Sequence, residues 1–188
     1  MRTVYASPNY MPALQPASYY YAASPVTSAT STTVGVGTLR VGPVLLHHPA
    51  HLVRLVADIA TAGEAGSKFR MGIYDDTGSG YPGTLIASGV VAADVSNSVP
   101  EVEIDASLEA GVYWFGGAVQ NVVTTQPTMR VVANWTPPLL GYAGSTRPSS
   151  GSAFPGILTA GVTAELPATF PGGSGASGSL ARLMFRTA

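Results

Sequence analysis

The chain has 188 residues, of which 10% are charged, and its formal net charge is −1 at pH 7. A typical soluble domain carries about 25% charged residues. The nine basic residues are scattered singly, so no basic stripe predicts nucleic-acid binding. No apolar run approaches the roughly 18 residues that a membrane span requires, and without cysteine there is no disulfide or thiolate metal site. We expect one soluble domain with no nucleic-acid or membrane partner.

Residues 1–38 differ from the rest of the chain. They contain several prolines and a Ser/Thr-rich stretch over 24–33, with no apolar period that would close a core of their own. Tyrosine rings bury well at interfaces, which favours an extended arm that orders against a partner; a disordered tail is the alternative. The tyrosines assigned to this assembly arm are Tyr5, Tyr10, Tyr19, Tyr20 and Tyr21.

Glycine and proline determine the fold class expected for residues 39–188. The 22 Gly and 15 Pro of the chain recur too often for helices of three or more turns. Seven or eight short apolar or alternating segments lie between turn clusters, which is typical of a sandwich. We therefore predict an all-β protein, a jelly-roll-like antiparallel β-sandwich with the extended N-terminal arm.

Alternation of apolar and polar side chains marks the expected strands. In 68–74 it points Phe69, Met71 and Ile73 into the core and Tyr74 outward. A breaker-rich stretch over 140–178 is expected to be a long loop excursion, and loops of that length are usually functional or interfacial. The expected strands are 52–60, 68–74, 85–91, 100–105, 112–120, 129–135 and a closing strand over 180–186.

Two groups of polar residues are weighed as metal sites. His47, His48 and His51 lie close together, but a proline interrupts their spacing and no acidic residue sits beside them, so we favour a surface turn. Asp75 and Asp76 open a Gly-rich loop, whereas calcium loops space their oxygen ligands along the chain, so a turn is favoured there too. We expect no metal and no cofactor.

Glu101, Glu103 and Asp105 share one face of an expected strand. Alternation with Val102 and Ile104 is what a solvated outer face produces, so we do not assign them as catalytic carboxylates. The sequence also has no Gly-x-Ser-x-Gly elbow, phosphate-binding loop or cysteine nucleophile. We expect that the protein is not an enzyme and has no catalytic residue.

Aromatic residues offer one candidate ligand surface. Tyr113, Trp114 and Phe115 alternate across a strand, so one face of that strand must be core and at most one or two of these rings are free to stack on a sugar. The candidate surface for a host-surface glycan consists of Asp75, Asp76, Tyr81, Trp114 and Trp135.

Three runs resemble a known module: RMGIYDD over 70–76, GYPGTLIASG over 80–89 and LEAGVYW over 108–114. They are similar to a β-sandwich module of tailed-bacteriophage virion proteins of the minor tail, tail-fibre and head-decoration types, particularly in phages of actinobacteria. The resemblance covers roughly 40–136 and, loosely, the last strand. It implies a structural role and a virion location, with no catalytic residues; the arm is not part of it.

These observations predict a non-enzymatic virion structural protein, a minor tail or fibre component or a capsid-decoration component, that assembles through its N-terminal arm. Its expected partners are other virion proteins and copies of itself, with a trimer as the suggested symmetry. The alternative is a carbohydrate-binding adhesin module for the host cell surface. The first residues have no apolar region after their single Arg, so no signal peptide is expected.

Overall fold

The computed structural model describes residues 13–22, 30–133, 156–176 and 179–188, and these contain strands and loops without a helix. Tyr5 and Tyr10, predicted as arm residues, and Trp135, predicted in the ligand surface, lie outside these residues. No helix among them could cross a membrane. The strands are β1 (Tyr19–Tyr21), β2 (Thr30–Thr32), β3 (Leu39–Leu46), β4 (Ala50–Val56), β5 (Ile59–Thr61), β6 (Lys68–Asp76), β7 (Pro82–Ala92), β8 (Glu101–Leu108), β9 (Gly111–Gln120), β10 (Thr128–Ala133), β11 (Gly156–Thr159), β12 (Ser174–Ala176), β13 (Ser179–Ala181) and β14 (Met184–Thr187).

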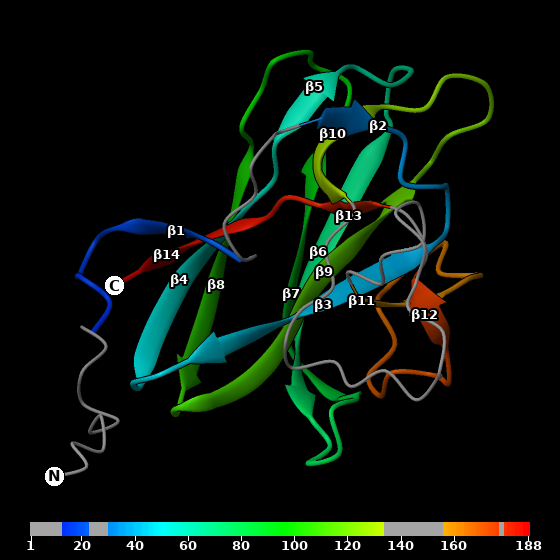
Figure 1. Ribbon diagram of the computed structural model, residues 1–188. Helices are drawn as coiled ribbons and strands as arrows, with labels where there is room; N and C mark the ends of the chain where they lie inside the picture. The colour runs from blue at the N-terminus through cyan, green and yellow to red at the C-terminus, as the bar shows by residue number, and fades with distance from the viewer. Residues whose placement is uncertain (1–12, 23–29, 134–155, 177–178) are drawn as a thin grey trace, which may run out of the picture.

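The strands form three antiparallel sheets (Figure 1). A large sheet has the order β12-β11-β3-β9-β6-β7. A side sheet has the order β1-β14-β4-β8, and an end sheet has the order β13-β10-β2, with β5 also paired to β10. The side and end sheets together pack against the large sheet, because all three contribute to one core cluster. The predicted all-β antiparallel sandwich is confirmed.

The main core lies between these layers. Phe69, Met71 and Ile73 are fully buried, as their alternation predicted. Across the layers, the rings of Phe115 and Phe185 lie 5.4 Å apart between centroids. Burying a large apolar side chain stabilises the fold by about 1.5–3 kcal/mol.

The expected strand over 52–60 is divided by a bend, because β4 ends at Val56 and β5 begins at Ile59. Asp58, in the bend, is only 7% exposed. Its carboxylate pairs with Arg130 at 3.3 Å and also with Arg182. A buried carboxylate is tolerated when cations and hydrogen bonds compensate it. Asp58 therefore holds the junction between the side and end sheets.

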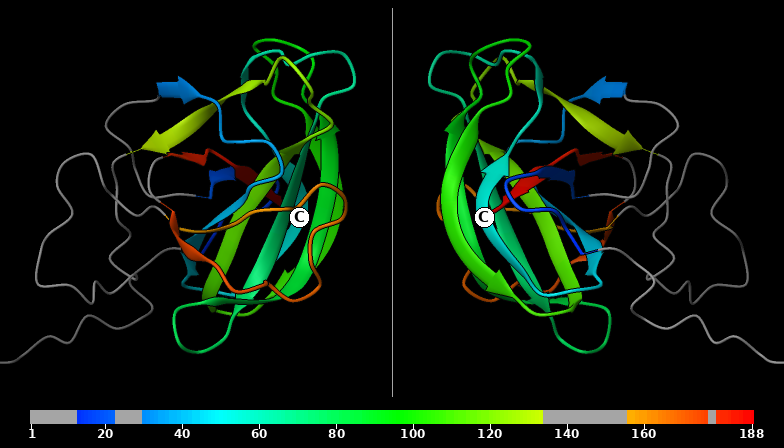
Figure 2. Two further views of the ribbon diagram at one scale, coloured as in Figure 1. Left: turned by 90° about the vertical axis from the view of Figure 1, so that its right-hand side faces the viewer. Right: turned by 90° about the vertical axis from the view of Figure 1, so that its left-hand side faces the viewer.

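A second core covers the other face of the large sheet. Tyr74 was expected to be exposed, but it is fully buried there together with Trp114. Residues 160–173, here called the strap, cover this face through Val162, Leu166 and Phe170. Figures 1 and 2 show the strap in orange, on the side of the large sheet away from the side sheet. The described part of the predicted excursion thus adds β11 and β12 to the large sheet and covers its second face with the strap.

The described parts of the predicted arm are joined to the sheets. β1 pairs with β14, and Tyr19 lies opposite Arg186. β2 pairs with β10, and Ala22 and Val34 are buried in the main core. Residues 13–22 and 30–38 therefore contribute edge strands and core side chains to the sandwich.

Candidate functional site on the outer face of the side sheet

β1 forms one edge of the side sheet and carries three consecutive tyrosines. Tyr20 points inward, where its ring stacks on Phe185 with centroids 5.8 Å apart. Tyr19 and Tyr21 point outward and are 52% and 54% exposed. The two-residue period of a strand explains this division. Two large aromatic rings are thus presented side by side to solvent.

Guanidinium groups lie over both exposed rings. The Arg182 Cζ is 4.8 Å from the Tyr21 ring centroid, and the Arg186 Cζ is 5.8 Å from that of Tyr19. Such cation–π contacts contribute about 0.5–1 kcal/mol at exposed sites. Arginine and tyrosine are both enriched in protein interfaces. The β1 edge therefore has the composition of an interaction surface.

A row of paired residues crosses the whole side sheet. Tyr19 is opposite Arg186, Arg186 is opposite Arg54, and Arg54 is opposite Glu103. Arg54 pairs with Glu103 at 2.9 Å and with Glu101 at 3.3 Å. The Tyr19 hydroxyl donates to Glu101 Oε2 at 2.9 Å, and this hydrogen bond to a carboxylate raises the pKa of Tyr19. These side-chain contacts link β1 to β8 across the outer face of the sheet.

The acidic side chains of this face all lie on β8. Glu101, Glu103 and Asp105 are exposed and Val102 and Ile104 pack against the main core, which confirms the predicted outer face. The Glu103 and Asp105 side chains are 80% and 91% exposed. These carboxylates form a stripe along the edge strand opposite β1.

The three histidines are distributed around the start of β4. His47 and His51 are exposed and His48 is half-buried. His51 Nε2 lies 2.7 Å from Asp105 Oδ1, so His51 joins the outer face of the side sheet. Within the described ranges, no group of three or more His, Asp or Glu residues is arranged to hold a metal ion.

Asp75, Asp76, Tyr81 and Trp114, the described members of the candidate ligand surface, lie together at one end of the large sheet, but their polar atoms are used internally. Asp76 Oδ1 accepts from the Gly78 amide at 2.7 Å and from the Gly80 amide at 3.2 Å. Asp76 Oδ2 accepts from Trp114 Nε1 at 2.9 Å. This carboxylate therefore shapes the loop, as the preference for a turn predicted.

The other members of that surface are also engaged. Asp75 accepts from the Thr84 amide. Trp114 is fully buried, which corrects its assignment as a ring free to stack on a sugar. Tyr81 is half-buried, its ring packs edge-on against Phe170 at 6.0 Å, and its hydroxyl donates to the Gly173 carbonyl at 3.3 Å.

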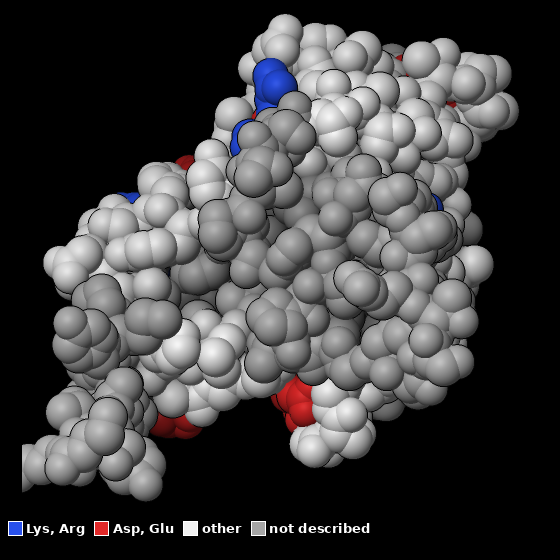
Figure 3. All heavy atoms as spheres, viewed as in Figure 1, with Lys and Arg blue, Asp and Glu red and all other residues white. Residues whose placement is uncertain are grey.

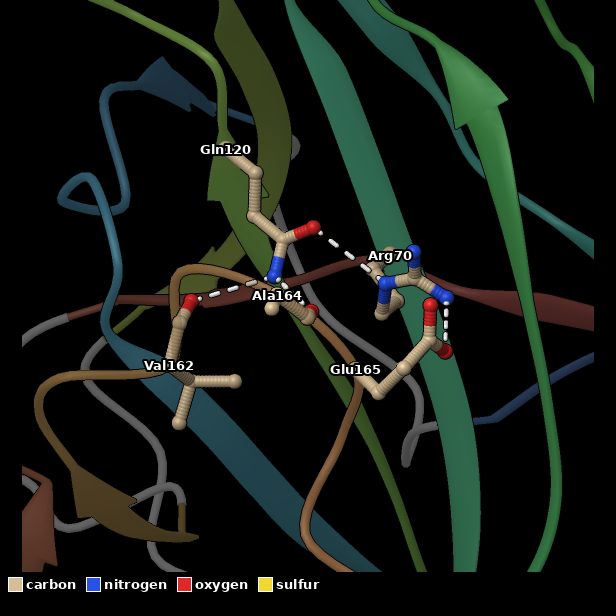
Figure 4. A network of polar contacts seen from close by, with 5 residues as sticks. All are labelled: Arg70, Gln120, Val162, Ala164 and Glu165. Atoms are coloured by element: carbon tan, nitrogen blue, oxygen red, sulfur yellow. Dashed lines mark hydrogen bonds and ion pairs between the residues drawn. The ribbon is translucent and has the colours of Figure 1, made fainter.

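A polar network that sequence reasoning missed fastens the strap (Figure 4). Gln120 Nε2 donates to the carbonyls of Val162 at 3.1 Å and Ala164 at 2.5 Å. Arg70 Nε donates to Gln120 Oε1 at 3.2 Å, and Arg70 Nη1 pairs with Glu165 at 2.6 Å. The partners are remote in sequence, so no local motif indicated the network.

The outer face of the side sheet is thus the described surface with the strongest interface character. No family model matches the chain, and no curated protein matches it significantly.

Proposed function

We propose that this protein is a non-enzymatic structural subunit of a tailed-bacteriophage virion, in the minor tail or fibre or in the capsid decoration, and that its N-terminal segment takes part in assembly. The resemblance of roughly residues 40–136 to the virion sandwich module supports the virion setting. One observation carries the assembly role: Tyr19 and Tyr21 are about half exposed on an edge strand, beside Arg182 and Arg186.

The physical reason is that rings and guanidinium groups desolvate at low cost and make directional contacts. Tyr and Arg dominate the few residues that supply most binding energy in interfaces. An edge strand adds unpaired backbone groups, which a neighbouring chain can satisfy. β1 combines the exposed tyrosines with such an edge, and Arg186 lies on the neighbouring strand β14.

The test is incorporation into particles made by a phage genome that encodes this chain. A Tyr19→Ser/Tyr21→Ser variant is compared with Val123→Ser, a control at a 92% exposed residue remote from β1. Circular dichroism and thermal unfolding first establish that both variants are folded. Mass spectrometry of purified particles then gives copy number. We expect wild type and Val123→Ser at similar copy number and the tyrosine variant reduced by about tenfold or more.

Absence of the wild-type chain from purified particles would overturn the virion proposal. Normal incorporation of the tyrosine variant would overturn the role of β1 while leaving a virion role intact. The carbohydrate-binding adhesin is the weaker candidate, because Trp114 is buried and the Asp76 carboxylate is used by its own loop.

A further inference from the structure

We infer that a second copy of this chain docks on the outer face of the side sheet, across a two-fold axis that runs along β4. In this arrangement, Arg186 of each copy faces the β8 carboxylates of the other. The inference rests on the proposed assembly role and adds the partner and the geometry. Its basis is that one face carries both cationic groups, on β14 and β4, and the carboxylate stripe of β8.

The charges on this face are sorted by strand. Cationic and aromatic groups lie on β1, β14 and β4, as Tyr19, Arg186 and Arg54, whereas the carboxylates lie on β8. Neighbouring strands are about 4.8 Å apart, so β14 and β8, with β4 between them, are separated by roughly 10 Å. A two-fold axis along β4 exchanges the two sides, which brings Arg186 over the β8 carboxylates twice. Arg54 lies near the axis and meets its own copy there, and Glu101 and Glu103 of the same chain compensate its charge.

Arg186 and Asp105, which carry opposite charges on this face, each lack a permanently charged partner among the described residues. All Asp and Glu of the chain lie in the ranges that the structure describes. Among these residues, no carboxylate pairs with Arg186. Within the described part of the chain, Asp105 pairs only with His51, which is charged only when protonated. Arg186 and Asp105 are therefore the groups that gain most from a partner.

The register allows these groups to meet. Arg186 shares a cross-sheet row with Arg54 and Glu103, and an axis along β4 keeps rows aligned. Glu103 then lies opposite Arg186 of the second copy, with Asp105 at the diagonal position, within reach of a long side chain. Such an isologous contact is self-complementary, which is the commonest interface of homo-oligomers. The Tyr19 ring, whose hydroxyl reaches Glu101 of β8, adds apolar area to it.

In a chain with few charged residues, Arg54, Arg186, Glu101, Glu103 and Asp105 concentrate charge on this face. Only 10% of the residues are charged, and Lys, Arg, Asp and Glu are sparse on the described surface visible in Figure 3. Electrostatic attraction would therefore orient an approaching second copy towards the side sheet.

The experiment is sedimentation velocity of the full chain at low ionic strength over a range of concentrations. The variants are Arg186→Glu, Asp105→Arg and the double reversal. We expect wild type to dimerise and each single reversal to weaken dimerisation by about tenfold or more. The double reversal restores opposite charges between positions 186 and 105, whereas Glu103 still opposes the new carboxylate, so it should recover part of the affinity that each single reversal loses. High salt should weaken the wild-type dimer.

Matched controls place the same charge changes elsewhere. Lys68→Glu reverses another exposed cation, and Val123→Arg adds a cation at a 92% exposed position. Both should dimerise like wild type, and circular dichroism checks that every variant is folded. A wild-type chain that stays monomeric at low salt would overturn the inference, as would single reversals that leave dimerisation unchanged.

Failure of the inference is separable from failure of the proposed function. A monomeric chain that still enters particles would refute the dimer and leave the virion role standing. A chain that dimerises as described but is absent from particles would refute the virion role and leave the dimer standing. Reversals that abolish dimerisation without rescue by the double variant would refute the Arg186–carboxylate geometry.

Discussion

The Asp76 carboxylate lies 2.9 Å from the indole nitrogen of the fully buried Trp114 and accepts its hydrogen bond. The same carboxylate accepts from two loop amides, so one side chain fixes both the β6–β7 loop and the second core. We predict that Asp76→Ala lowers the free energy of unfolding by about 2–3 kcal/mol, because it leaves the buried N–H without an acceptor. Urea denaturation followed by tryptophan fluorescence measures this. Ser79→Ala, in the same loop, should change stability by less than about 1 kcal/mol.

The hydrogen bonds of Glu64 predict that the folded protein loses stability in acid. Its carboxylate accepts from the amides of Val123, Thr124 and Thr125 and from the Thr124 hydroxyl, and these hydrogen bonds lower its pKa to about 2, from an ordinary 4.5. A carboxyl group with a lowered folded pKa stabilises the protein above its unfolded pKa, and this contribution is lost as pH falls from about 4.5 towards 2.

Glu64→Gln should therefore destabilise the protein at pH 7, and the difference from wild type should shrink below about pH 4.5. Denaturant unfolding at a series of pH values measures both. Glu109→Gln, at an exposed side chain, is the control. A constant difference between wild type and Glu64→Gln down to the acid limit would contradict the role of these hydrogen bonds.

The hydrogen bonds from Gln120 to the strap predict that this side chain stabilises the folded position of the strap. It is 3% exposed, and Gln120→Ala would leave the Val162 and Ala164 carbonyls without their side-chain donor. We expect a loss of about 1–3 kcal/mol, expressed as faster hydrogen exchange at strap amides such as Phe170, which donates to the Gly83 carbonyl. Glu165→Gln removes only an exposed ion pair and should cost less than about 1 kcal/mol. Equal exchange in wild type and Gln120→Ala would show that apolar packing alone holds the strap.

The ion pairs of Asp58 predict that removing this one charge lowers the free energy of unfolding. Asp58→Asn removes the buried carboxylate that pairs with the partly exposed Arg130 and Arg182, and losing such charge-assisted hydrogen bonds costs about 1.5–3 kcal/mol. Thermal and urea unfolding measure the loss. Glu101→Gln, on the exposed outer face, should cost about 1 kcal/mol or less. If the two variants are equally stable, Asp58 does not hold the sheet junction.

The sequence predicted strands best where one face is core and the other is solvent. Alternation correctly placed Phe69, Met71 and Ile73 inward, and Glu101 and Glu103 outward. The prediction was wrong for Tyr74, because alternation gives the direction of a side chain and cannot show that the strap covers that direction. Burial on both faces removes the polar residues that make a strand recognisable.

β3 was missed because it contains Pro43, which interrupts a strand pattern. The register explains how the proline is accommodated. β11 pairs with β3 only from Leu39 to Val41, so Pro43 has a strand partner on one side, Trp114 of β9. A proline is tolerated where no ladder hydrogen bond is required of its nitrogen.

The candidate surface was predictable only in part. Composition indicated that the tyrosines form contacts, but three consecutive tyrosines carry no signal of which ring points inward, and packing against Phe185 decides this for Tyr20. The contribution of β8 to the same face depends on pairing with β4, a contact between distant segments. The acidic stripe was correctly predicted as exposed, but its position relative to β1 required the fold.

The strap has a practical consequence for modifying this protein. Because it covers one face of the large sheet while the main core covers the other, β9 is buried continuously from Trp114 to Gln120. Saturation mutagenesis should find almost no tolerated polar substitution along that strand. Fluorescent labels and affinity tags belong instead on distal loops such as the one that carries Val123, which is 92% exposed.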